Sequence, residues 1–386
     1  MAALRVAPAI IAPLAVAASL LAGAPEVGAL ASAHQSAPAP ATAYVVNEGG
    51  TVVPGTVTPI STATDIAGSP IKVGGVPFAI AITPNGKTAY VTDISRNLVI
   101  PISTATNKAG RPIKVGVGPF NLAITPNGKA VYVANNDSST VTPISTRSEK
   151  AGRAIRVAEY PGYIAISANG KSVYSVGLTR MSVISTATNK VSKSIRVGSS
   201  SHAIVISPNS KNVYVTNGNM LLRINAATRR VTRRIRVGAD WGLAISPDGK
   251  TLYTFGCSSG AASGTITPIP TATLRPARPI RPGFCAASDI FTPDGKTLYV
   301  VDSPDGTRSG AVISISTATN TVGSPVSAGQ QPGPMAILPG ATASAASTLY
   351  VVNTGSGSVT PISTTTGQAG APIPVGYLPT SIGIAR

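Results

Sequence analysis

Short apolar stretches alternate with polar turns along most of the chain. The clearest example is FAIAITPNGKTAYVTD, from Phe78 to Asp93, in which an apolar strand is followed by a turn and a second strand. Pro84 presets the second position of that turn, and Gly86 suits the left-handed position that follows. This stretch therefore predicts a β-hairpin.

The hairpin recurs with small changes throughout the sequence. Its turn is repeated as ITPNGK, ISANGK, ISPNSK, ISPDGK and FTPDGK, beginning at Ile124, Ile166, Ile206, Ile245 and Phe291. The tyrosines of the second strand lie 39 to 51 residues apart, at Tyr44, Tyr90, Tyr132, Tyr174, Tyr214, Tyr253, Tyr299 and Tyr350. A period of roughly 40–45 residues with four strands per unit is typical of a β-propeller blade. We predict an all-β protein with eight four-stranded blades, or seven if one irregular unit is not a blade.

The two ends of the repeat region complement each other. Tyr44 to Gly74 supplies three strands and lacks the one that begins the other units, whereas Ser381 to Arg386 supplies a lone inner strand, SIGIAR. Pairing of this C-terminal strand with the N-terminal blade would close the ring and leave no open sheet edge between the ends. We therefore expect a single propeller domain over residues 44–386.

The N-terminal residues have a different composition. Residues 1–33 carry Arg5, an apolar run from Ala9 to Ala22, and a small-residue site at Ala31-Ser32-Ala33, which together predict a secretory signal peptide. Residues 34–43 form a Pro/Ala-rich lead-in. No stretch is long and apolar enough to predict a transmembrane span. We expect a secreted protein that is extracellular or associated with the cell surface.

Several strands end in a recognisable four-residue motif. It reads YVVN at Tyr44, YVTD at Tyr90, YVAN at Tyr132, YVTN at Tyr214, YVVD at Tyr299 and YVVN at Tyr350. Over the predicted propeller, the sequence resembles the YVTN β-propeller repeat proteins, which are often exported or surface-associated. The resemblance implies the propeller fold. The wider superfamily also contains lactonases and other hydrolases or lyases, so it implies an enzyme as an alternative function.

The formal net charge is +18, which suggests a polyanionic partner. Twelve basic residues belong to the repeat itself, in the outermost strands, where they discourage edge-to-edge pairing, and in the hairpin turns. A denser group goes beyond the repeat: Arg223, Arg229, Arg230, Arg233, Arg234 and Arg236. These residues are candidate ligands of an anionic cell-envelope polymer. Nucleic acid is disfavoured because no aromatic residues are interleaved with the arginines for base stacking.

Aromatic and acidic residues gather in the connections of one propeller face, here called the top. The candidate ligand-binding residues at the top of the central channel are Phe78, Phe120, Tyr163, His202, Asp240, Trp241 and Asp289. Flat rings supply apolar binding area with few rotamers to freeze. The competing interpretation, which we favour for the rings, is that they plug the channel and pack between blades.

Known catalytic and metal-binding patterns are missing from the sequence. His202 is the only histidine after the lead-in, so a two-histidine metal site or relay is unavailable, and no Gly-x-Ser-x-Gly motif is present. We assign no catalytic residue, metal or cofactor. Cys257 and Cys285 are predicted on the top of neighbouring blades, where an exported protein would join them in a disulfide.

These observations favour a monomeric, non-catalytic binding or scaffold protein of the cell envelope. Its basic rim and bottom face would attach to anionic polymers, and its aromatic top face would bind a glycan, a peptide or another ligand. The alternative is a lactonase-like hydrolase or lyase with its site at the top of the channel, around His202, Asp240 and Asp289.

Overall fold

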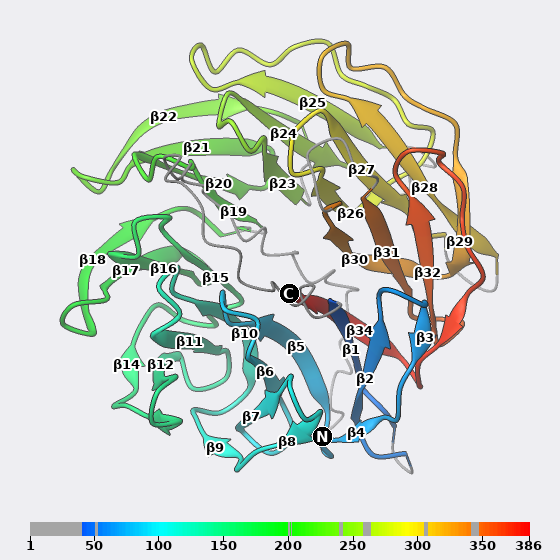
Figure 1. The fold of residues 1–386 in the computed structure, drawn as a ribbon. Coiled ribbons are helices and arrows are strands. Elements are labelled where there is room, and N and C mark those ends of the chain that lie inside the picture. The colour runs from blue at the N-terminus through cyan, green and yellow to red at the C-terminus, as the bar shows by residue number, and fades with distance from the viewer. Residues whose placement is uncertain are drawn as a thin grey trace, which may run out of the picture.

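The computed structural model describes residues 41–50, 53–199, 201, 203–238, 242–257, 264–304, 308–340 and 347–386. These residues form eight antiparallel sheets, which are arranged in a ring as the blades of a β-propeller (Figure 1). The prediction of eight blades is confirmed, and the alternative of seven is wrong. The predicted signal peptide and most of the lead-in lie outside the described residues.

Each blade is built from strands that run in sequence from the centre of the ring outward. The innermost strands of blades 1 to 8 are β34 (Pro379–Ala385), β5 (Pro77–Ile82), β10 (Pro119–Ile124), β15 (Tyr163–Ile166), β19 (Ile204–Ile206), β23 (Gly242–Ile245), β26 (Ala286–Phe291) and β30 (Pro332–Leu338). The second strands are β1 (Thr42–Asn47), β6 (Thr88–Asp93), β11 (Ala130–Asn135), β16 (Ser172–Val176), β20 (Asn212–Asn217), β24 (Thr251–Gly256), β27 (Thr297–Asp302) and β31 (Thr348–Asn353).

The third strands are β2 (Thr56–Ser61), β7 (Leu98–Ser103), β12 (Thr140–Ser145), β17 (Arg180–Ser185), β21 (Met220–Asn225), β25 (Thr265–Pro270), β28 (Ser309–Ser316) and β32 (Ser358–Ser363). The outer edges are β3 (Ile66–Ala67) with β4 (Ile71–Lys72), β8 (Lys108–Ala109) with β9 (Ile113–Lys114), β13 (Lys150–Ala151) with β14 (Ile155–Arg156), β18 (Lys190–Arg196), β22 (Arg230–Arg236), β29 (Val326–Gln330) and β33 (Ile373–Pro374). In blade 6 the bridge between Ile266 and Ile280 takes the place of an outer strand.

The ring is closed by the two ends of the propeller. The C-terminal strand β34 pairs antiparallel with β1, and Ala43 lies opposite Ile384. This pairing confirms the predicted closure, which leaves no unpaired edge between the first and last blades.

The hydrophobic core lies between neighbouring blades. Eight clusters of buried residues each draw on two adjacent sheets. The eight repeat tyrosines are buried in these clusters, and several donate their hydroxyl to the next blade. Tyr44 donates to Asn107 Oδ1 at 2.7 Å, and Tyr132 donates to Asn189 Oδ1 at 2.7 Å. The repeat tyrosines therefore fill the interfaces between blades, and several of them also join the two blades by a hydrogen bond.

A proline in the third strand accompanies a divided outer edge in blades 1–3, although the outer edge of blade 7, with Ser314 at that position, is also divided. In blade 2, Pro101 accepts a hydrogen bond from Gly110 N at 2.7 Å but has no N–H to return, and the outer edge is divided into β8 and β9. In blades 4 and 5 the same position is Val183 and Arg223, and each outer strand is a continuous run of seven residues. Blades 4 and 5 therefore present the longest outer strands of the described chain.

Candidate functional site

Two of the predicted channel-mouth rings lie together. Phe78 and Phe120 are the second residues of the inner strands β5 and β10 of adjacent blades, and their ring centroids are 4.5 Å apart with the planes tilted by 32°. Both side chains are half-buried. Thr380 of blade 1 donates its hydroxyl to the carbonyl of Phe78 at 3.0 Å. The second residues of three consecutive inner strands are thus linked by contacts.

Tyr163 has a different environment. It begins β15 and packs against the hydrophobic cluster that blades 4 and 5 share, which includes Val197 and Ile204. Burial raises the pKa of Tyr163 to about 12, so its phenol remains protonated at neutral pH. This packing agrees with the interpretation that some of the aromatic residues fill the spaces between blades.

Three of the predicted ligand-binding residues, His202, Asp240 and Trp241, lie outside the described residues. Their role at the channel mouth stays a prediction. The described members of the set divide between opposite parts of the ring, because Phe78 and Phe120 belong to blades 2 and 3 and Asp289 belongs to blade 7.

Asp289 occupies a position that is apolar in all other blades. It lies in β26 opposite Val300 of β27. The equivalent inner-strand residues are Ile80, Leu122, Ile164, Ile204, Leu243, Met335 and Ile382, which belong to or pack against the clusters between blades.

The surroundings of Asp289 are hydrophobic. The cluster between blades 6 and 7 contains Phe255 and Phe284. Although the Asp289 side chain keeps some exposure to solvent, burial raises its pKa to about 7. A carboxyl group with this pKa exchanges its proton near neutral pH, which suits either a pH-sensitive ligand contact or acid–base chemistry.

The six arginines predicted to bind a polyanion lie on the outer part of blade 5. Arg223 is in β21, Arg229 is in the turn that follows, and Arg230, Arg233, Arg234 and Arg236 are in β22. Blade 4 extends this group with Arg180 in β17 and with Lys190, Lys193 and Arg196 in β18. We call these ten residues the basic surface. All of them are exposed except Arg223 and Arg229, which are half-buried.

The basic surface is free of acidic neighbours in the sequence. Residues 160–239 contain 12 Lys and Arg residues and no Asp or Glu, so they supply +12 of the total net charge of +18. Residues 41–159 contribute +5 (11 basic, 6 acidic), and residues 240–386 contribute +1 (7 basic, 6 acidic). Positive charge is therefore concentrated on one side of the ring as well as in the repeated turns.

No ion pair neutralises the basic surface within the described part of the chain. The ion pairs found there are Arg96–Asp93, Lys250–Asp248 and Lys296–Asp294. Like charges also lie directly opposite each other, since Arg180 pairs with Arg196 and Arg223 pairs with Arg233 across the strands. Such pairs destabilise a sheet. Protection of a strand edge needs only a single Lys or Arg, so the structure carries more charge here than edge protection requires.

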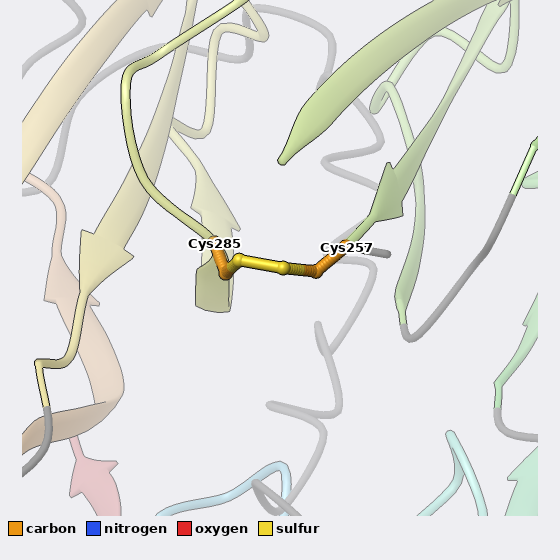
Figure 2. Close-up of a disulfide and its surroundings, with 2 residues drawn as sticks. All are labelled: Cys257 and Cys285. Atoms are coloured by element: carbon orange, nitrogen blue, oxygen red, sulfur yellow. A yellow bond between two sulfur atoms is a disulfide. The ribbon is translucent and has the colours of Figure 1, made fainter. Parts of the chain in front are cut away.

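The predicted disulfide between Cys257 and Cys285 is confirmed. Cys257 follows β24 of blade 6 and Cys285 precedes β26 of blade 7, with Cα atoms 5.5 Å apart (Figure 2). The bond joins the two blades beside the interface that contains Asp289. The disulfide therefore links the two blades at the interface where Asp289 replaces the apolar residue of the other blades.

One groove on the top face was not predicted from the sequence. It has a volume of about 890 Å³ and is formed by the connections of blades 7, 8 and 1, including Gln330, Gln331, Ser356 and Tyr377. The exposure of Tyr377 depends on how three separate loops meet.

The described residues contain no group of three or more His, Cys, Asp or Glu side chains that could hold a metal ion. They also contain no helix that could span a membrane.

Comparison with solved structures supports the propeller fold. The chain is similar to the dihydro-heme d1 dehydrogenase NirN in complex with DHE, with 13% identity, coverage of 89% of this chain and 74% of that chain, and a TM-score of 0.71. It is similar to AztD from Citrobacter koseri, with 11% identity, coverage of 89% and 97%, and a TM-score of 0.66. It is also similar to hydrazine synthase from Kuenenia stuttgartiensis, with 22% identity, coverage of 79% and 88%, and a TM-score of 0.55.

No protein-family model and no curated protein matches the chain. At these identities the structural likeness shows the fold alone. The resemblance to YVTN repeat proteins continues to rest on the sequence motifs.

Proposed function

We propose that this protein is an exported, non-catalytic binding propeller that attaches to an anionic polymer of the cell envelope through its basic surface. The observation that carries the proposal is the concentration of ten Lys and Arg side chains, without an ion-pair partner in the described chain, on the third and outer strands of blades 4 and 5 and the turn between β21 and β22. Arginine binds phosphate and carboxylate groups through two parallel hydrogen bonds.

The shape of these strands suits a linear partner. β18 and β22 are continuous strands of seven residues, so their basic side chains follow extended edges on two neighbouring blades. A polymer that carries a negative charge on each unit can contact several arginines at once, and each contact adds to the binding free energy.

Export is supported by two features. Residues 1–33 have the pattern of a signal peptide, and the Cys257–Cys285 disulfide is of the kind that forms in oxidising compartments. Secretion of the full chain, followed by mass determination of the mature N-terminus, would test the cleavage after Ala33.

A ligand-binding role for the top face is a further part of the proposal. Phe78 and Phe120 supply two stacked, half-buried rings there, and a propeller of similar structure, NirN, was solved in complex with DHE. The alternative of a lactonase-like enzyme is favoured by one observation, the pKa of Asp289 near 7. A lactone substrate panel with the Asp289→Asn variant would test it, and activity that depends on this carboxyl group would replace the non-catalytic proposal.

The main test is co-sedimentation of the protein with isolated cell walls. We would compare the parent with a variant in which Arg229, Arg230, Arg233, Arg234 and Arg236 are changed to Gln. A matched control changes Lys108, Arg111, Lys114, Arg153 and Arg156, five basic residues of blades 2 and 3, to Gln.

We expect the five-arginine variant to lose at least tenfold in wall binding and the control to lose less than threefold. Because net charge falls equally in both variants, such a difference would come from the position of the charges. Equal losses in the two variants would show that only overall charge matters. No binding of the parent at low salt would contradict envelope attachment.

A further inference from the structure

The groove on the top face lies across the ring from the basic surface. Its walls come from the connection between β29 and β30, the turn between β31 and β32, and the connection between β33 and β34. In a ring of eight blades, the interface between blades 8 and 1 is opposite the interface between blades 4 and 5. A molecule in the groove would therefore leave the basic surface free.

The lining of the groove carries no charged side chain, and most of its surface is apolar. It includes Gln330, Gln331, Val375, Tyr377 and Leu378 and no Asp, Glu, Lys, Arg or His. The hydroxyls of Thr354 and Ser356 are already hydrogen-bonded, to the carbonyl of Pro379 at 2.8 Å and to Ser358 Oγ at 3.0 Å. Three glycines of the lining, Gly355, Gly357 and Gly376, allow the loops to pack closely, because a Cβ atom on Gly357 would lie 2.6 Å from the carbonyl oxygen of Gly376.

The hydrogen-bonding groups of the main chain in the groove are largely used. Gln330 N donates to Ser356 Oγ at 3.3 Å, and Gly355 N donates to the carbonyl of Gln330 at 3.0 Å. In contrast, the side-chain amides of Gln330 and Gln331 make no hydrogen bond with the described residues. Each amide can donate two hydrogen bonds and accept two, so both are available to a ligand.

Tyr377 presents an aromatic surface at the same place. Its side chain is 58% exposed. The wall behind it is a close-packed loop, because a Cβ atom on Gly50 would lie only 3.4 Å from the ring. An exposed ring with support behind it is a stacking surface for a flat apolar face.

The backbone holds two of these loops in an unfavourable conformation. Gln331 and Leu378, each followed by a proline, have φ values of 49° and 50°, in the left-handed region where only glycine is free of strain. Blade 3 uses Gly118 at the equivalent position, with φ of 65°. The side chains of Gln331 and Leu378 are therefore kept at a local cost, which Tyr160 also bears, with φ of 50°, in the loop between blades 3 and 4.

We propose that this groove binds a neutral oligosaccharide. The hydroxyl groups of a sugar both donate and accept hydrogen bonds, which matches the paired donors and acceptors of the two glutamine amides. The C–H face of a sugar ring packs on an aromatic ring, which Tyr377 supplies. The uncharged lining favours a neutral sugar over an acidic one, and a volume of about 890 Å³ accommodates several sugar units.

The proposal is tested by titration of the mature protein with maltotetraose, cellotetraose and chitotetraose, followed by saturation-transfer NMR and calorimetry. We expect at least one of the three to bind with a Kd below about 1 mM. Tyr377→Ala should weaken that binding at least tenfold, and Gln331→Gly should weaken it severalfold without loss of folding, because glycine suits the left-handed backbone.

The matched control is Tyr160→Ala. Tyr160 lies in the corresponding loop between blades 3 and 4 and is 57% exposed, but it is outside the groove. It immediately precedes a proline and so has the position of Leu378, one residue after that of Tyr377. This variant should bind as the parent does, and so should the five-arginine variant. The proposal is overturned if none of the three sugars binds at 10 mM, or if Tyr160→Ala and Tyr377→Ala weaken binding equally. Neither result depends on whether the basic surface binds a polymer.

Discussion

Blades 1–3 and blades 4–7 follow the same architecture with different fidelity to the repeat. In blades 1–3 the third strand carries a proline at Pro59, Pro101 and Pro143, and each outer edge is divided into two short strands. Blades 4, 5 and 7 replace that proline with Val183, Arg223 and Ser314. Blade 7 also has Asp289 where the other blades have an apolar residue. The disulfide links blade 7 to blade 6.

The comparison shows where the chain has given up stability. A like-charge pair across two strands, an acid among apolar residues and an arginine in a left-handed turn each destabilise the fold. They occur in blades 4–7, where the basic surface and Asp289 lie, while blades 1–3 lack the like-charge pairs and the inner-strand acid and share only charged left-handed turn residues, of which Glu149 is one. Four predictions test this difference, in order of decreasing effect on the free energy of unfolding.

The largest effect is expected from the disulfide of blades 6 and 7. The bond closes a loop with a sequence separation of 28 residues, for which chain entropy gives a stabilisation of about 3–4 kcal/mol. The Cys257→Ser/Cys285→Ser variant should lower the free energy of unfolding by that amount in denaturant titrations. An unchanged midpoint would mean that the irregular interface does not need its covalent link.

The second prediction converts blade 5 to the form of blades 1–3. Arg223→Pro removes a backbone N–H from the third strand, and the continuous strand β22 should lose stability by about 2–3 kcal/mol. The control is Arg223→Val, the residue of blade 4, which should change stability by less than about 0.5 kcal/mol. Thermal unfolding of both variants decides the matter. Equal midpoints would show that proline does not determine the division of the outer edge.

The third prediction concerns pH. Because burial raises the pKa of Asp289 from an ordinary value near 4 to about 7, the folded state favours the protonated carboxyl group. The contribution of Asp289 to stability should therefore be greatest below about pH 4 and fall as pH rises to about 7. Since the side chain is partly exposed, we expect the free energy of unfolding to change by roughly 2 kcal/mol over this pH range, which is less than the full pKa shift would give.

Asp289→Leu restores the residue found in blade 6 and should remove this part of the pH dependence. The measurement is the free energy of unfolding of both proteins at pH 4.5 and pH 8. The difference between them should grow toward pH 8 in favour of Asp289→Leu. A difference that is constant with pH would contradict the assigned titration.

The smallest effect is expected at Arg229. In blade 4, Asn189 has the equivalent left-handed turn position and accepts a hydrogen bond from Tyr132 of blade 3 at 2.7 Å. Arg229→Asn should offer the same acceptor to Tyr174 and raise the free energy of unfolding by about 1 kcal/mol. It should also weaken polyanion binding, because one charge of the basic surface is lost.

A matched control for this variant is Glu149→Asn. Glu149 has the equivalent position beside Tyr90, whose buried hydroxyl has no hydrogen-bond partner in the described chain. This variant should gain similar stability without weakening polyanion binding. If both variants change binding alike, the effect at position 229 is not one of local charge.

Most of the fold could be predicted because the residues of the repeat themselves form the hairpin turns and the packing between blades. The spacing of the tyrosines and of the Pro-Asn/Asp-Gly turns gave the number of blades, and the lone strand at Ser381 to Arg386 gave the ring closure. The division of the outer edge was not predicted. A signal for it is visible in the sequence, because Pro101 of blade 2 is replaced by Val183 in blade 4 and by Arg223 in blade 5.

The candidate sites were less predictable, because they depend on contacts between distant loops. The disulfide followed from the placement of two cysteines on adjacent blades, and the six arginines were found from their density. The absence of acids over residues 160–239 was an available signal that was not used. The exposure of Tyr377 and the unpaired amides of Gln330 and Gln331 depend on three loops that come together only in the folded ring.

The most direct test of the central claim is the salt dependence of binding to a defined polyanion. The dissociation constant for linear polyphosphate would be measured from 50 to 500 mM salt for the parent, the five-arginine variant and the matched control of blades 2 and 3. If the basic surface binds the polymer, the logarithm of affinity should fall steeply with the logarithm of salt concentration in the parent and the control. The five-arginine variant should show a much shallower slope. The same slope in both variants would contradict a binding site on blades 4 and 5.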